Sequence, residues 1–310
     1  MITRISDNAR FDTIAGNISN LQDSMSRASD QLATLKKINR PSDDPEGTTI
    51  ALNLRSAGAS IEQHKENIIG GETWLKVTGL NLNSINDLLM LAQGLAQNAE
   101  VASASDRTAA ADSLQNFSDQ ILSFANAKLN GRYMFSGSKT DTKPFPDSAG
   151  AYEGDSQALL INIGQNSSTA AYNVTGDAVF PASVGGGVAL FETFDALVAA
   201  LRAPYSTDAE IADADAETAT ALASFKDASQ EVQVQVQDNI TKTSAMLSNL
   251  EFADNHLTYL KDRVENMISK SEDADVSKLA MEFQMQALAL NASYTVAGKM
   301  NEGSLLNFLS

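Results

Sequence analysis

The residues with the clearest chemical potential are the two histidines, because an imidazole can act as a general base or a metal ligand near neutral pH. His64 falls on an apolar stripe with helical spacing, and His256 stands beside Leu257, far away in the chain. The chain contains no cysteine, so a transition-metal site would have to rely mostly on carboxylates. We therefore interpret both histidines as packing residues rather than as catalytic groups.

A short acidic cluster offers a second candidate site. Asp213, Asp215 and Glu217 alternate in the way that calcium ligands do in a loop. They lack the glycine at the sixth position and the closing glutamate of an EF-hand. Residues 207–217 are rich in alanine and acid and contain no basic residue, so we predict a solvated acidic linker and no metal site.

Two glycine-containing stretches look superficially like nucleotide-binding loops. In residues 131–140 (GRYMFSGSKT), Ser138 interrupts the glycine–lysine pair that a phosphate-binding loop requires. Residues 185–187 precede a helical pattern, but no G-x-G-x-x-G follows a strand. Both stretches are typical of turns, so we predict no catalytic residue, no cofactor and no enzymatic activity.

The net charge of −17 restricts the possible partners. Affinity for nucleic acid depends on Lys and Arg side chains that neutralise phosphates, and binding to an anionic membrane surface needs basic residues as well. The sequence has no run of about 18 apolar residues, the length that a membrane span requires. We therefore expect no nucleic-acid partner and no membrane partner. The lack of cysteine suits a protein exported without an oxidative folding step.

The elements that dominate the sequence are its two ends, which carry matching heptad patterns. Apolar residues recur at alternating spacings of three and four, the pattern of a helix that packs on another helix. Neither stripe can be buried alone, so we predict that the N- and C-terminal helices pair as a coiled coil. The stripes consist of Phe11, Ile14, Ile18, Leu21, Met25, Ala28, Leu32 and Leu35, and of Val276, Leu279, Phe283, Gln286, Leu290, Ser293, Ala297 and Met300.

Between the ends, further heptad patterns predict long antiparallel helices that form a rod. One pattern keeps its phase through Gly70 and Gly71, where glycine would otherwise favour a break. Another keeps its phase through residues 232–236 (VQVQV), which alternate like a strand. We trust the longer patterns and predict continuous helices. The expected helices span residues 11–38, 45–97, 105–130, 190–202, 220–270 and 275–310.

A proline-rich segment separates the first helix from the rod. Pro41 disfavours the helical conformation at the residue before it and ends the first helix. Asp44 can cap the next helix, and Pro45 suits its first turn. We expect a hinge there and a second hinge at residues 271–275. The first hinge consists of Arg40, Pro41, Ser42, Asp43, Asp44 and Pro45.

Turn-forming residues become dense from residue 133 onward and surround two short β-prone runs, at residues 158–163 and 171–175. The predicted fold class is therefore mainly α, with a small β-rich insert on a helical rod. The helical patterns do not need the insert, so we expect it to be dispensable for folding. The expected domains are residues 1–40 with 275–310 for terminal assembly, 41–145 with 187–274 for the rod, and 146–186 for the outer insert.

Several stretches resemble one known family. Residues 38–45 (INRPSDDP) resemble the segment that joins the terminal helix to the rod in the flagellin superfamily, in the form of its hook-associated protein 3 branch. The other similar stretches are residues 131–137 (GRYMFSG) and 140–145 (TDTKPF) after the third helix, residues 152–155 and 176–180 in the insert, and residues 304–309 at the end.

The resemblance implies a secreted structural protein of the bacterial flagellum, exported unfolded through the flagellar type III channel with a chaperone on its C-terminal region. It implies a ring of several copies of the chain between hook-associated protein 1 on the hook side and flagellin on the filament side. We expect both ends to supply the assembly interface. Its residues are Phe11, Ile14, Ile18, Leu21, Met25, Leu32, Leu35, Val276, Leu279, Phe283, Leu290, Leu305, Leu306 and Phe308.

Two other functions stay open from the sequence. One is a filament flagellin, and the other, of a different class, is a carboxylate-metal hydrolase built on a helical rod. For an assembly protein, we expect residues 1–38 and 275–310 to be disordered in the free monomer and helical in the assembly, because an isolated helix is only marginally stable in water.

Overall fold

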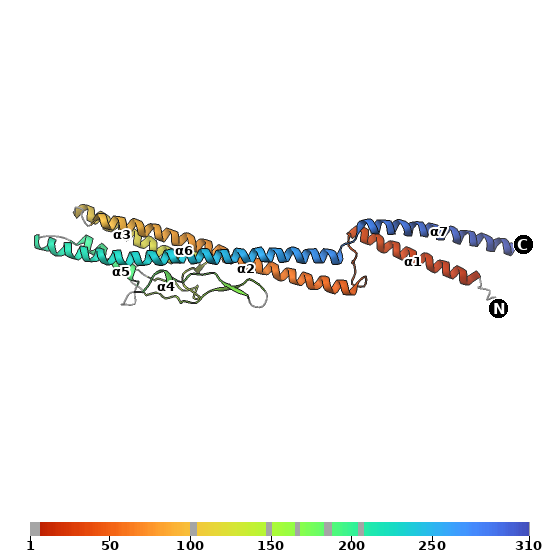
Figure 1. The fold of residues 1–310 in the computed structure, drawn as a ribbon, viewed down its shortest axis with the longest axis horizontal. Helices are drawn as coiled ribbons and strands as arrows, with labels where there is room; N and C mark the ends of the chain where they lie inside the picture. The colour runs from red at the N-terminus through yellow and green to blue at the C-terminus, as the bar shows by residue number, and fades with distance from the viewer. Residues whose placement is uncertain are drawn as a thin grey trace. The chain divides into compact units, whose positions relative to one another are not determined.

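The computed structural model describes residues 7–99, 104–146, 151–164, 168–182, 188–203 and 208–309 (Figure 1). The described chain is mainly helical with a small β-rich insert, as predicted, and it contains two small antiparallel strand pairs. Its helices are α1 (Asp7–Thr34), α2 (Pro45–Ala99), α3 (Ala104–Ala125), α4 (Gly176–Val179), α5 (Ala189–Arg202), α6 (Asp208–Glu272) and α7 (Val276–Leu309). Its strands are β1 (Lys128–Leu129), β2 (Arg132–Tyr133), β3 (Leu160–Asn162) and β4 (Thr169–Ala171).

The chain divides into two compact units. The terminal unit contains Met1–Ser60 and Tyr259–Ser310, and the central unit contains Ile61–Thr258. The long helices α2 and α6 each contribute to both units. None of the helices in the described part of the chain is both long enough and apolar enough to cross a membrane.

In the central unit, α2 and α6 run antiparallel. Lys65 Nζ lies 3.0 Å from Asp254 Oδ1, and Gln93 Nε2 donates to Ser229 Oγ at 3.0 Å. The predicted apolar stripes fill the space between the two helices, which explains why both helices continue through the glycine pair and the VQVQV run. The buried side chains of this seam include Ile61, Ile68, Leu75, Leu82, Ile85 and Leu89 on α2, and Phe225, Val232, Val236 and Leu250 on α6.

The start of α6 differs from the prediction. Residues 208–217 form its first turns, so the expected acidic linker at residues 207–217 is wrong. Acidic side chains stabilise the N-terminal end of a helix, where the helix dipole is positive, and alanine has the highest helix propensity. The same composition that indicated a solvated linker is therefore compatible with the first turns of a long helix.

The end of α3 also differs from the prediction. The helix ends at Ala125, and the sequence that was expected to be its last turn forms the β1–β2 hairpin. Asn130 (φ 52°) and Gly131 (φ 81°) occupy the turn. An Asn-Gly pair suits a tight hairpin because both central residues require positive φ. The Asn-Gly dipeptide was the available signal for this hairpin.

The second strand of the insert lies earlier than predicted. Strand β4 covers Thr169–Ala171 rather than residues 171–175, and Ile161 pairs with Ala170. Beyond β4, Tyr172 N still donates to Leu159 O at 3.1 Å, and a side chain makes the next contacts: Leu159 N donates to Asn173 Oδ1 at 2.8 Å. Asn173 Nδ2 in turn donates to Gln157 O at 3.2 Å. The amide of Asn173 thus satisfies the backbone groups that a longer strand would have paired.

The insert lies against the long helices of the central unit, as Figure 1 shows for α4 and its neighbouring strands in green. Asn67 Nδ2 on α2 donates to Asn162 O at 3.0 Å, and the rings of Trp74 and Tyr172 meet edge to face at 5.9 Å. Asn239 Nδ2 on α6 donates to Ala178 O at 2.9 Å. These contacts join the β3–β4 hairpin and α4 to the rod.

The insert also shares the hydrophobic core of the central unit. Val174, Val179 and Phe180 are buried in one cluster with Phe145 and Phe191. The Phe180 and Phe145 rings lie 5.3 Å apart, and the Phe180 and Phe191 rings lie 5.7 Å apart. This shared core argues against the expectation that the insert is dispensable for folding, because its removal would expose aromatic side chains from flanking elements.

A loop network holds the residues that join the third helix to the insert. Tyr152 Oη lies 2.8 Å from Phe135 O and 2.9 Å from Asp155 O, and it accepts a hydrogen bond from Gly176 N at 3.3 Å. Burial raises the pKa of the Tyr152 hydroxyl, so it remains a proton donor at physiological pH. Gly137 has a φ of 67°, and a Cβ there would collide with Asp155 O.

The Asp155 carboxylate closes the same loop. It accepts hydrogen bonds from Ser138 Oγ at 2.6 Å and from Ser138 N at 2.7 Å. The hydroxyl bond, and then the backbone bond, lower the pKa of the Asp155 carboxyl below its ordinary value. The carboxylate form is therefore favoured in the folded chain.

The two adjacent glycines of α2 allow a matched test of how the insert packs. A Cβ on Gly71 would lie 2.7 Å from Ile161 Cδ1 and 3.1 Å from Leu250 Cδ1, whereas a Cβ on Gly70 would meet nothing within 4 Å. We expect Gly71→Ala to gain less stability than Gly70→Ala, because the Ile161 and Leu250 methyl groups must move aside and this overpacking offsets part of the gain in helix propensity. We expect Gly70→Ala to raise the free energy of unfolding by about 1 kcal/mol, because alanine is the better helix former. Denaturant unfolding of both variants measures the two free energies of unfolding, and an equal or larger gain in Gly71→Ala would contradict the packing.

The Asp155 network predicts a dependence of stability on pH. A carboxyl whose pKa is lowered by folding stabilises the folded chain above its unfolded pKa, and this stabilisation is lost as the pH falls through the lower, folded pKa. Between neutral pH and about pH 4, near the ordinary Asp pKa, Asp155→Asn should melt at a lower temperature than the parent chain. Below that range the difference should shrink. The exposed Asp141 is the control, and Asp141→Asn should follow the parent at every pH.

Candidate assembly surface

Helices α1 and α7 pack side by side and antiparallel in the terminal unit, with the N- and C-terminal ends of the chain at the same end of the pair (Figure 1). Gln22 Nε2 donates to Tyr294 Oη at 2.8 Å, and Ala274 N donates to Leu35 O at 3.0 Å. Among the seam residues whose side chains are described, Ala28 and Leu279 are buried. The two ends of the chain therefore meet, as the matching heptad patterns indicated.

The other predicted seam residues are covered less completely. On the described part of α1 and α7 they are half-buried: Ile14, Ile18, Leu21, Met25, Leu32, Phe283 and Leu290. Val276 is 47% exposed. The side chains of Phe11, Leu305, Leu306 and Phe308 lie outside the described residues. Pairing of α1 with α7 alone thus leaves much of the seam open to water, and the coiled-coil geometry stays a prediction.

The predicted end of the first helix is wrong. Helix α1 ends at Thr34, and Leu35 adopts a left-handed conformation (φ 58°) with 54% of its surface exposed. Leu35 is therefore no seam residue. Pro41 does not end this helix either, because the helix has already ended several residues earlier. The helix ends where the chain turns to pair with the segment that precedes α7.

Helix α7 carries a second apolar face that the heptad analysis missed. Met281 (60% exposed), Met285 (66%) and Leu288 (72%) recur at helical spacing on the side opposite Leu279, and Val296 (50%) continues the stripe. With Lys278, Glu282 and Gln284, the first three residues line an open groove. We call Met281, Met285, Leu288 and Val296 the outer face of α7.

The sequence did contain a signal for this face. From Leu279 to Leu290, apolar residues occur on every side of the helix. A helix that is apolar all round is normally buried all round, whereas a search for one stripe follows a single side. The outer face is an exposed apolar patch of the kind that marks interaction sites.

The first hinge is a hydrogen-bonded turn. Asp43 Oδ2 accepts from Arg40 N at 2.8 Å and from Asn39 N at 3.1 Å. Asp44 Oδ1 accepts from Gly47 N at 2.8 Å, which is the N-cap geometry predicted for the start of α2. The hinge residues thus begin α2 in a defined way; their role in movement stays a prediction.

The two connecting segments meet at the Glu272 carboxylate. Glu272 Oε2 lies 3.0 Å from Lys36 Nζ and 2.7 Å from Arg55 Nη2. The Glu272 side chain is only 6% exposed. Lys36 follows α1, Arg55 belongs to α2, and Glu272 ends α6, so one buried carboxylate links three parts of the terminal unit. Sequence reasoning did not identify this cluster, because its members are far apart in the chain.

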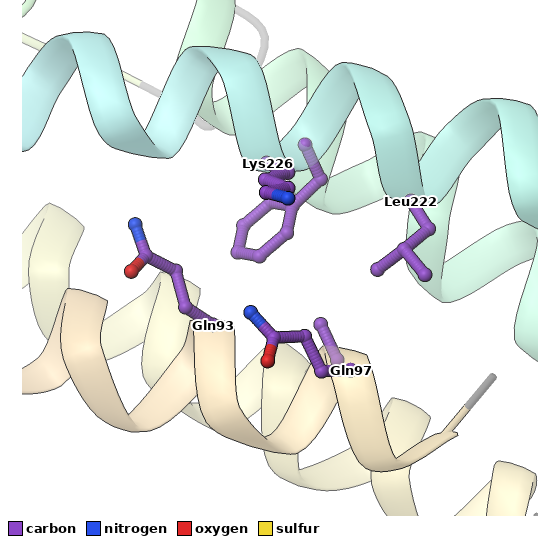
Figure 2. Close-up of a pocket in the computed structure, with 6 residues that line it drawn as sticks. Gln93, Gln97, Leu222 and Lys226 are labelled. Atoms are coloured by element: carbon purple, nitrogen blue, oxygen red, sulfur yellow. The ribbon is translucent and has the colours of Figure 1, made fainter. Parts of the chain in front are cut away.

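The central unit contains a small cavity of about 90 Å³ between α2 and α6. Figure 2 shows Gln93 and Gln97 on one helix, opposite Leu222 and Lys226 on the other. These side chains supply no carboxylate, imidazole or hydroxyl nucleophile in the cavity. The cavity is therefore a packing feature of the seam.

The histidines and acidic residues that were considered as possible catalytic or metal-binding groups do not form a common site. His64 is half-buried on α2, and His256 is exposed on α6. The acidic residues at 213, 215 and 217 lie within a helix instead of a binding loop. Within the described ranges, no group of three or more His, Cys, Asp or Glu side chains is placed to hold a metal ion.

Comparison with known proteins shows similarity to proteins of the bacterial flagellum. Residues 5–140 match the model of the bacterial flagellin N-terminal helical region. Flagellar hook-associated protein 3 of Escherichia coli is 27% identical over 93% of this chain and 94% of its own length. The protein of the same name from Salmonella typhimurium is 24% identical over 97% of this chain and 98% of its own length. The chain is thus similar to flagellar hook-associated protein 3 along nearly its whole length, and to the flagellin N-terminal helical region over residues 5–140.

The similarity to flagellar hook-associated protein 3 is matched by a similarity of fold. A solved structure from Vibrio parahaemolyticus, described as a flagellar hook-associated protein, shares the fold. Its TM-score is 0.66 at 23% identity, over 74% of this chain and 100% of that chain. The relatives are flagellar hook-associated proteins by name, and the resemblance inferred from the sequence is confirmed.

The left-handed conformation of Leu35 gives a test of how α1 ends. For a residue with a Cβ, this conformation costs about 1–2 kcal/mol, and glycine adopts it readily at the end of a helix. We expect Leu35→Gly to raise the free energy of unfolding of the terminal unit by about 1 kcal/mol. The control Ala33→Gly, inside α1, should lower it by about 1 kcal/mol. Amide hydrogen exchange of α1 measures both, and slower exchange in Ala33→Gly than in Leu35→Gly would contradict this helix end.

Proposed function

We propose that this protein is the structural component of the bacterial flagellum that joins the hook to the filament. The observation that carries the proposal is the similarity to flagellar hook-associated protein 3 from two organisms, over more than nine tenths of the chain. The protein is secreted and extracellular in the flagellum, and it has a structural rather than an enzymatic role. The paired termini and the outer face of α7 supply the surface for assembly.

The proposed partners follow from this position. Other copies of the chain form the ring, with hook-associated protein 1 on the hook side and flagellin on the filament side. An export chaperone holds the C-terminal region before secretion. We propose three domains. Residues 1–40 with 275–310 form the terminal assembly domain, residues 41–145 with 187–274 form the helical rod domain, and residues 146–186 form the outer insert domain.

The incomplete burial of the termini supports assembly through them. Isolated helices are marginally stable in water, and the α1–α7 pair buries few of its seam residues fully. Burying one Leu or Met side chain contributes about 1.5–3 kcal/mol, so contacts to several neighbours can offset the entropy of ordering both ends. We propose that the ends exchange between helical and disordered states in the free monomer and become stably ordered on assembly, which suits export in an unfolded state.

A substitution on the outer face of α7 tests the proposed function. Met285→Gln with Leu288→Gln changes side chains that are exposed in the monomer, so folding and secretion should be normal while assembly fails. In a deletion strain, the variant should reach the medium but restore little motility, and flagellin should be shed into the medium.

The matched control changes an exposed leucine elsewhere. Leu160 is 60% exposed in the insert, and Leu160→Gln should restore motility fully. Normal motility with the α7 variant would contradict assembly through the outer face. Loss of motility with both variants would point to a general defect in folding or export.

A filament flagellin is the second candidate, since the matched family model describes the N-terminal helical region of bacterial flagellin. A filament protein polymerises with itself without limit, whereas a junction protein forms a short ring. Growth of long filaments by the purified protein alone would favour the flagellin function over the junction function.

A further inference from the structure

The segments that connect the terminal helices to the long helices pair with each other. Lys37 N donates to Glu272 O at 2.7 Å, and Ala274 N donates to Leu35 O at 3.0 Å. Between these two bonds, Lys36 and Asp273 form an antiparallel bridge. The end of α1 and the start of α7 are therefore fixed by the same pair of backbone hydrogen bonds.

Each terminal helix depends on this bridge for its end. Leu35, which ends α1 in the left-handed conformation, supplies the carbonyl that Ala274 N contacts. The next residue after Ala274 is Asp275, whose Oδ1 accepts from Lys278 N at 3.1 Å in the first turn of α7. If the bridge opens, the hydrogen bond to Leu35, the residue directly after α1, is lost. Asp275, which caps the first turn of α7, is then no longer held in place.

The Glu272 side chain holds the bridge closed. Its carboxylate, almost fully buried, contacts Lys36 Nζ from the α1 side and Arg55 Nη2 from α2. Lys36 and Arg55 are 42% and 52% exposed, so solvent screens each pair in part. A buried carboxylate is the sensitive member of such a cluster, because removing its charge leaves two cations without their shared acceptor.

Further hydrogen bonds reinforce the same crossing. Gln31 Nε2 on α1 donates to Lys37 O at 2.8 Å. Ser271 Oγ on α6 donates to Gly47 O on α2 at 3.4 Å. These contacts tie the crossing to the last turn of α1 and to the neighbouring ends of the long helices.

We propose that Glu272 is a latch that couples the two terminal helices, so that α1 and α7 become ordered and disordered together. Without the latch, each helix would order separately when it met a partner. With the latch closed, ordering of one helix places the end of the other. The coupling is a property of the single chain and does not depend on the proposed position in the flagellum.

Amide hydrogen exchange on the full-length protein tests the latch directly. We expect Glu272→Gln to speed exchange at Lys37 and Ala274 by about tenfold, since hydrogen bonds to charged groups are the stronger ones. Exchange should rise by a similar factor along both α1 and α7, and α2 beyond Ser60 should be unchanged. The control is Glu265→Gln, an exposed site on the same helix, which should leave all these rates unchanged. Faster exchange in only one terminal helix, or in neither, would overturn the proposal.

Direct packing of α1 on α7 could also couple the two helices. A second substitution distinguishes coupling by packing from coupling by the Glu272 latch. Ala289→Gly weakens α7 at an exposed site remote from the crossing. In the parent chain, Ala289→Gly should also speed exchange in α1. In the Glu272→Gln background, Ala289→Gly should no longer affect α1. An equal response of α1 in both backgrounds would assign the coupling to helix packing and overturn the latch.

If Glu272→Gln prevents folding, Arg55→Met weakens the latch less severely. It keeps the ion pair between Lys36 and Glu272 and replaces a side chain that is half-exposed. It should produce a smaller rise in exchange at Lys37 and Ala274, shared by α1 and α7. A rise confined to α2 around residue 55 would overturn the coupling.

Discussion

The antiparallel contact between α2 and α6 is the interaction on which the central unit depends. Single helices of 55 and 65 residues gain most of their stability from burying an apolar face rather than from helix propensity. Here each buries its stripe against the other, from the Lys65–Asp254 pair to the Gln93–Ser229 hydrogen bond. The shorter elements then pack on this pair, and their aromatic side chains join one common core. Continuous helices through Gly70 and Gly71 are a consequence of this burial.

The glycine pair shows why a local weakness in a helix can be a requirement of the fold. Gly71 costs helix stability, but its missing side chain provides the space that Ile161 and Leu250 occupy. The hairpin can therefore approach the backbone of α2 closely enough for Tyr172 to meet Trp74. Gly70 lies beside it and faces open space. In the sequence the two residues look alike, and only the packing of the insert distinguishes them.

The features predictable from the sequence are those that repeat along it. Heptad phase predicted α2, α5 and most of α6, and local capping chemistry predicted the start of α2 at Asp44. The missed features depend on partners that are distant in the chain. The end of α1 at Thr34 is fixed by hydrogen bonds to residues 272–274, and the Glu272 cluster joins Lys36 and Arg55 to a residue more than 200 positions away. The outer face of α7 was missed for another reason. The heptad pattern on the Leu279 side already accounted for a helix, so the second apolar side was not looked for.

Helix α7 is apolar on two opposite sides, and this limits how the terminal helices can be buried. A single partner helix can cover only one side of α7, and α1 covers the side that contains Leu279. Single exposed apolar residues are common on protein surfaces, but Met281, Met285 and Leu288 form one stripe on a strongly acidic chain. A helix that is apolar on opposite sides is suited to a wall built from several subunits, where a neighbour lies on each side. In the proposed assembly, such a helix would enter the wall together with its intramolecular partner, because α7 placed without α1 would leave its Leu279 side open. The proposed latch at Glu272 would provide that linkage within one chain.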